Sequence, residues 1–196
     1  MNLKSGKIIS IILAIAVIAI VTIFIMATNT KSQFHEGKYS DKTYPGEQQY
    51  IENNPSIHQR IRNEMVEAEK ELASNPRDMK YLLMLASALY NFSEYDQAED
   101  VLQYALTVDP KQETAWSNLV EVYRSKKDQA RVESTLKQWI AEREDLSEPY
   151  VKLAREYYYS NRKQEALDVL KIAAEKTKDK KLIEAVIKVI NEGGDF

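Results

Sequence analysis

Apolar residues are concentrated in one long run near the start of the chain. Residues 8–27 contain no charged residue, glycine or proline, and most of them are Ile, Leu, Val or Phe. A helix of this length spans about 30 Å, which matches the hydrocarbon core of a bilayer. The run therefore predicts a transmembrane helix, with residues 1–27 as an N-terminal membrane anchor.

Two further observations bear on this segment. A cleaved signal peptide usually has a shorter apolar stretch that ends in a small-x-small site, but Ile25 occupies a position where a small residue is required. Lys4 and Lys7 precede the run, and positive charge is typical of the cytoplasmic side. We therefore expect a single-pass membrane protein of a bacterial-type inner or plasma membrane. Its N-terminus would be cytoplasmic, its body extracytoplasmic, and residues 8–27 would contact the bilayer.

The next segment, residues 28–55, is polar and shows no apolar periodicity, which predicts a flexible linker. Its scattered aromatic residues are interpreted as isolated loop residues; they are Phe34, Tyr39, Tyr44 and Tyr50. From 56 to 74 apolar residues recur at steps of three and four, which predicts an amphipathic leading helix. Asn75-Pro76 ends this pattern, because the residue before proline avoids the helical conformation.

An internal repeat is the clearest pattern in the chain. Three segments, at about 79–112, 113–146 and 147–180, superimpose when each is shifted onto the next. The aligned sets of the first half are Leu82, Trp116 and Tyr150, then Leu85, Leu119 and Leu153; those of the second half are Ala98, Val132 and Ala166, then Leu102, Leu136 and Leu170. Each segment is 34 residues long, which two helices with short turns would fill. Each pair of helices buries its apolar face by stacking on its neighbours. The expected N-caps of the second helices are Ser93, Asp128 and Asn161.

These motifs resemble the tetratricopeptide repeat family. Trp116-x-x-Leu119 with Tyr123 matches the first half of the family pattern, and Ala98, Leu102, Ala105 and Pro110 match the second half. The resemblance implies an all-α, tetratricopeptide-like α-solenoid over residues 56–196, following one N-terminal transmembrane helix. A capping helix at 181–192 would close the array with Leu182, Ile183, Ala185, Val186, Val189 and Ile190 on its apolar face, and Gly193-Gly194 would end it.

Composition narrows the function. Lys4 and Lys7 are the only charges before residue 28, so the remaining chain has 25 basic and 30 acidic residues. This acidic balance argues against a nucleic-acid partner, which requires clustered basic charge. The absence of cysteine excludes disulfides and thiolate chemistry.

Catalytic patterns are weak. His35 and His58 have no ligand spacing around them and are expected to be exposed, and the repeats contain no glycine-rich phosphate loop. Carboxylates fall on polar helix faces, where solvation explains them. We expect no enzyme activity, no cofactor, no metal and no small-molecule substrate; a carboxylate-dependent enzyme is the alternative from another class.

Binding of other proteins is the better-supported hypothesis. In the family that the chain resembles, the first helices of successive units line a concave groove. The resemblance places the following residues there as candidate protein-binding positions: Tyr90, Asn91, Glu121, Arg124, Arg155, Tyr158 and Tyr159. Tyrosine and arginine are frequent in interface hot spots. We expect the tyrosines to supply apolar contact, and Arg124 and Arg155 to pair with partner acids.

The sequence therefore predicts a membrane-anchored scaffold or assembly factor that binds partner proteins through this groove. The alternative with the same fold is a docking receptor for protein targeting whose body faces the cytosol.

Overall fold

The computed structural model describes residues 34–35 and 37–194, and every regular element in this part of the chain is helical. A short 3-10 helix at Pro45–Glu47 leads into α2 (Gln48–Asn53) and α3 (Pro55–Ser74). The six helices of the repeats are α4 (Met79–Asn91), α5 (Tyr95–Val108), α6 (Glu113–Ser125), α7 (Gln129–Glu142), α8 (Ser147–Tyr159) and α9 (Lys163–Lys176). The last helix is α10 (Lys180–Glu192). The predicted all-α solenoid is confirmed.

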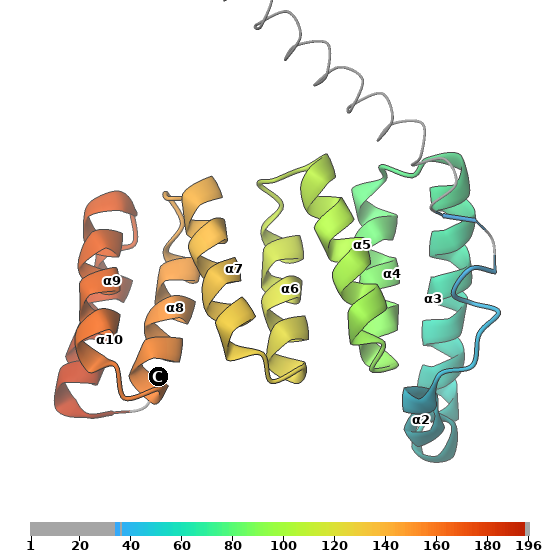
Figure 1. Ribbon diagram of the computed structural model, residues 1–196, viewed down its shortest axis with the longest axis horizontal. Coiled ribbons are helices and arrows are strands. Elements are labelled where there is room, and N and C mark those ends of the chain that lie inside the picture. Colours follow the sequence, from blue (N-terminus) through green and yellow to red (C-terminus); the bar gives the residue numbers. More distant parts are fainter. Residues whose placement is uncertain (1–33, 36, 195–196) are drawn as a thin grey trace, which may run out of the picture.

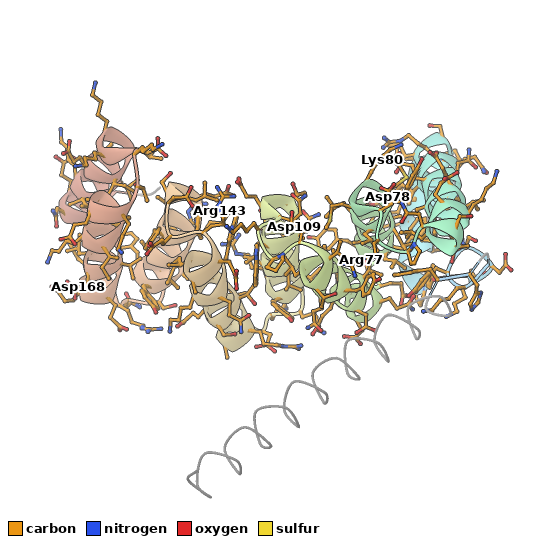
Figure 2. All side chains as sticks on the ribbon, turned by 90° about the horizontal axis from the view of Figure 1, so that it is seen from above. Arg77, Asp78, Lys80, Asp109, Arg143 and Asp168 are labelled. Carbon is orange, nitrogen blue, oxygen red and sulfur yellow. The ribbon has the colours of Figure 1, made fainter. Side chains whose placement is uncertain are left out.

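The helices form two rows. Consecutive helices run in opposite directions across the array (Figure 1). Figure 2 looks down on the edge marked by Arg77, Asp109 and Arg143, where the turns between units lie. From this side the array is a shallow arc with α6 and α8 on its hollow side. We call this the inner side and the opposite one the outer side.

Repeat-equivalent residues form the core. Leu82, Trp116 and Tyr150 are buried, as are Leu102, Leu136 and Leu170. The small residues Ala98 and Ala166 are 0% exposed, which lets paired helices approach closely. Each unit therefore buries its apolar face against its neighbours, as stacked repeats require.

The turns inside the repeats differ in detail from the prediction. Asp128 is an N-cap, because its carboxylate accepts a 3.0 Å hydrogen bond from the backbone N–H of Arg131. Ser93 and Asn161 are not caps. They have φ angles of 63° and 58°, and Lys127 at the equivalent position has 57°. A left-handed residue one place before the N-cap thus recurs in every unit and sets the direction of the second helix.

The first described residues also differ from the predicted linker. Phe34, Tyr39 and Tyr44 are 1%, 5% and 5% exposed. We call residues 34–35 and 37–53 the strap; Figure 1 shows its blue segment running along α3. Its aromatic residues are buried because the repeats leave apolar and hydrogen-bonding surface between α3 and α5, which periodicity in the strap itself does not reveal.

Membrane attachment requires a correction. Within the part of the chain that the structure describes, no helix is long and apolar enough to cross a bilayer. The predicted anchor, residues 1–27 with its span at 8–27, lies outside the described residues. The predicted localisation as a single-pass membrane protein with a cytoplasmic N-terminus and an extracytoplasmic body is therefore wrong by this finding.

The helix α10 covers the last repeat. Its buried residues are Ile183, Val186 and Ile190. Leu182 is 49% exposed, so it lies outside the apolar face to which the pattern assigned it, and Ala185 is exposed too. Gly193 ends the helix with a φ of 73°, as the Gly-Gly pair predicts.

Candidate functional site

A hollow of about 290 Å³ lies between the first helices α4 and α6. Its apolar floor consists of Ala86, Leu102 and Val122. Its polar rim consists of Ser87, Tyr90, Asn91, Asn118 and Glu121. We call this hollow the inner groove. An apolar floor with a few polar groups around it is the usual form of a binding site.

The ring of Tyr90 is held in place from two sides. Its centroid lies 5.5 Å from that of Tyr95, in a tilted arrangement. Its hydroxyl lies 2.9 Å from the Ser125 hydroxyl on α6, close enough for a hydrogen bond. Because the ring is fixed before a ligand arrives, little side-chain entropy is lost on binding.

A charged network follows on the α8 side. The Arg124 guanidinium donates a 2.6 Å hydrogen bond to the Glu121 carboxylate. It also donates bonds of 3.0 and 2.5 Å to the Glu156 carboxylate on α8. The Lys152 ammonium lies 3.9 Å from Glu121 and 3.5 Å from Glu148. Arg124 thus cross-links α6 to α8, and its charge is neutralised within the chain.

The remaining predicted residues form a separate cluster on α8. The rings of Tyr158 and Tyr159 lie 5.6 Å apart. The side chain of Tyr159 is 55% exposed and Arg155 is exposed as well. None of these three residues lines the inner groove.

The structure therefore divides the predicted set. It brings Tyr90, Asn91 and Glu121 to the inner groove and places Arg124 beside Glu121. It also adds Asn118, which the sequence mapping misses. That mapping selects one face of each first helix, whereas the stacking of α4 on α6 turns the neighbouring position of α6 towards the hollow as well.

Two histidines and the carboxylates are the candidates for acid–base chemistry. His35 is exposed, but His58 is half-buried, with its Nε2 atom 3.1 Å from Glu47 and its ring 5.8 Å from that of Phe92. His58 therefore differs from the exposed residue expected, because it packs beneath the strap. The described residues contain no group of three or more His, Cys, Asp or Glu side chains that could hold a metal ion.

Comparisons with known proteins agree on the fold. A family model described as tetratricopeptide repeat matches residues 40–186. No curated protein matches the chain. A solved structure similar to this chain is TTC0263, a thermophilic TPR protein of Thermus thermophilus, with 19% identity, a TM-score of 0.52, and coverage of 75% of this chain and 87% of that one. Another is MamA, with 16% identity, a TM-score of 0.52, and coverage of 76% and 82%. At these identities the likeness shows the fold alone.

Proposed function

We propose that this chain, which belongs to the tetratricopeptide repeat family, binds a segment of a partner protein along its inner side. The fold is that of an interaction scaffold, and the family is typically not enzymatic. The observation that carries the proposal is the inner groove, a hollow of about 290 Å³ with an apolar floor and a polar rim.

The inner groove suits one anchoring side chain of a partner. Its floor of Ala86, Leu102 and Val122 offers apolar contact, and the oriented ring of Tyr90 adds an aromatic wall. Asn91 and Asn118 carry amide groups that can both donate and accept hydrogen bonds. Such a site binds a peptide by an apolar side chain in the hollow and by hydrogen bonds from the rim to the peptide backbone.

The α8 cluster extends the contact surface. Arg155, Tyr158 and Tyr159 belong to the next first helix along the inner side. The exposed Tyr159, the partly buried Tyr158 and the exposed Arg155 are of the residue types found in interface hot spots. Arg124 is the less accessible partner for an acid, because it pairs with Glu121 and Glu156 and its side chain is only 28% exposed. Arg155, which is exposed, is the more accessible contact for an acidic residue of the bound segment.

Site-specific photocrosslinking tests this proposal in the full chain. A photoreactive residue replaces Ser87, an exposed residue at the rim, in one variant, and Lys188 on α10 in the control. We expect Ser87 to trap a defined partner and Lys188 to trap none. Tyr159→Ala should then weaken that complex without lowering the melting temperature, because the ring is more than half exposed.

Equal trapping at both positions would contradict a specific inner groove. Trapping at Ser87 with no effect of Tyr159→Ala would confine the site to the α4–α6 hollow.

A further inference from the structure

The strap shows what the outer side of this solenoid binds. Pro76 and Pro110 lie one repeat length apart, so α3 occupies the second-helix position of a unit that precedes the first repeat. The strap lies between α3 and α5 and contacts both. The backbone N–H groups of Tyr39 and Ser40 donate to the Glu69 carboxylate on α3. The Tyr44 hydroxyl donates to Gln97 on α5 at 3.3 Å, and the Phe34 ring lies 5.5 Å from that of Tyr104. Glu69, Gln97 and Tyr104 are thus three points at which the aromatic strap is held.

The repeat carries the same three positions one unit further on. The three repeats are spaced by 34 residues. The residues 34 positions after Glu69, Gln97 and Tyr104 are Gln103, Arg131 and Gln138. All three line one hollow of about 390 Å³ between α5 and α7. Its other lining residues are Leu106, Trp116, Leu119, Tyr123, Ser134 and Thr135. We call this hollow the outer groove.

We propose that the outer groove binds a segment of a partner protein that carries an aromatic residue next to acidic residues. The equivalent groove of the preceding unit holds the strap, whose buried aromatic residues at 34, 39 and 44 lie before, within and after a run of turns. Since successive units have the same backbone arrangement, the outer groove offers the same track to a second segment.

Gln103 can take the role that Glu69 has under the strap. Its Nε2 atom donates to Glu99 at 3.1 Å and to the Tyr123 hydroxyl at 3.2 Å. Both N–H groups of the Gln103 amide thus point to partners within the protein. The Oε1 atom of Gln103 can therefore accept a hydrogen bond from a backbone N–H of a bound segment, as the Glu69 carboxylate does. Gln138 takes the repeat position of Tyr104, which supports the Phe34 ring, and Leu106 lines the same hollow.

Charge separates the two grooves and determines the occupant. The strap carries Lys38 and Lys42, and the charges of Asp100 and Glu69 act on Lys38. The outer groove has Ser134 in place of Asp100 and Gln103 in place of Glu69. It also presents Arg131, whose side chain is 42% exposed even though it pairs with Glu99 and Asp128. An acidic segment is therefore favoured over a basic one such as the strap of a second copy.

The probe for this proposal is a fluorescent peptide of residues 33–46 with the changes Lys38→Glu and Lys42→Glu, titrated into the full chain. The expected result is saturable binding, measured by anisotropy. Ser134→Glu on the outer groove should weaken it by about fivefold or more, because like charges repel. The matched control is Ser74→Glu, the same change at the end of α3 and outside both grooves, which should leave the affinity unchanged. Both serines are exposed, so both variants should keep the wild-type melting curve.

Three results would overturn the proposal. One is the absence of saturable binding. Another is binding that Ser134→Glu leaves unchanged, because the peptide would then occupy another surface, such as the groove of the strap itself. The third is tighter binding of the unmodified peptide, which would make the strap of a second copy the occupant. A peptide with Phe34, Tyr39 and Tyr44 all changed to alanine should bind no more tightly than the labelling dye alone.

Discussion

Replacing Gly46 by alanine tests whether the strap is an integral part of the fold. A Cβ atom at Gly46 would lie 2.1 Å from the carbonyl oxygen of Phe92 and 2.5 Å from its carbonyl carbon. Both distances are far below van der Waals contact, and both atoms belong to the backbone. Phe92 is 0% exposed and follows the end of α4, so the strap must move and the helix cannot.

The size of the destabilisation follows from the contacts that a movement of the strap would break. Glu47 is 2% exposed and accepts a 3.1 Å hydrogen bond from the Tyr44 backbone N–H; it also contacts His58 at 3.1 Å and pairs with Arg62. Overpacking of this kind costs about 1–3 kcal/mol. For a chain of this size that corresponds to a melting temperature lower by roughly 2–12 °C.

The sign of the effect makes the experiment decisive. Without a clash, Gly→Ala would stabilise the protein by about 0.4–1 kcal/mol, because it restricts the unfolded chain. The assay is calorimetry together with hydrogen exchange at the Tyr39 and Ser40 amides, which detects a strap that detaches on its own. The control is Gly194→Ala, whose nearest contact is a side-chain atom of Val189 at 3.1 Å and not a backbone atom. A raised melting temperature with unchanged amide protection would refute the account of the strap.

Three further predictions concern the strap, a contact between units, and the last helix. Burial raises the pKa of Tyr39 from 10.0 to about 12. The stability that its neutral phenol contributes is therefore present below pH 10 and is lost as the pH rises towards 12. In melting curves over this pH range, Tyr39→Phe should lose less stability than the wild type. Arg162→Ala should lower the melting temperature more than Lys171→Ala. Arg162 pairs with Glu133 at 2.7 Å and lies 4.1 Å from the Tyr157 ring centre, whereas Lys171 pairs with Asp168 on the same helix. Equal losses would contradict a stabilising contact between units. Deleting residues 180–196 removes the buried Ile183, Val186 and Ile190 and should lower the free energy of unfolding by about 5–9 kcal/mol. This loss should appear as a lower melting temperature or as aggregation. An unchanged melting curve would rule out α10 as the cap.

The repeat made most of the solenoid predictable. Its regular spacing identifies positions such as Leu82, Trp116 and Tyr150 as core, and the structure buries them. Trp139 is instructive, because the family pattern expects a small residue there. It is nevertheless 0% exposed, so the unit accommodates the larger ring within its packing. Its indole N–H has no hydrogen-bond partner in the described structure.

The strap could not be predicted from the same kind of pattern. Phe34, Tyr39 and Tyr44 show neither helical nor strand periodicity, and their partners lie much further along the chain, on α3 and α5. The carboxylates of Glu47 and Glu69 are 2% and 1% exposed, against the usual preference of glutamate for the surface. Only the fold brings Arg62, His58 and backbone N–H groups to them.

The candidate site was predictable in position more than in chemistry. The repeat mapping finds Tyr90, Asn91 and Glu121 because it assigns each first helix an inner face. It cannot show that Glu121 and Glu156 neutralise Arg124, since that depends on how α6 and α8 approach each other. Charge pairing across units is thus the part of the site that requires the structure.

The affinity of the partner trapped at Ser87 for two matched variants tests the central claim most directly. Ser87→Glu places a charge at the rim of the inner groove, and Ser134→Glu places the same charge in the outer groove. We expect a dissociation constant about tenfold or more higher for Ser87→Glu, which corresponds to about 1.4 kcal/mol, and no change for Ser134→Glu. Equal affinity of the wild type and Ser87→Glu, with both proteins folded, would contradict binding in the inner groove.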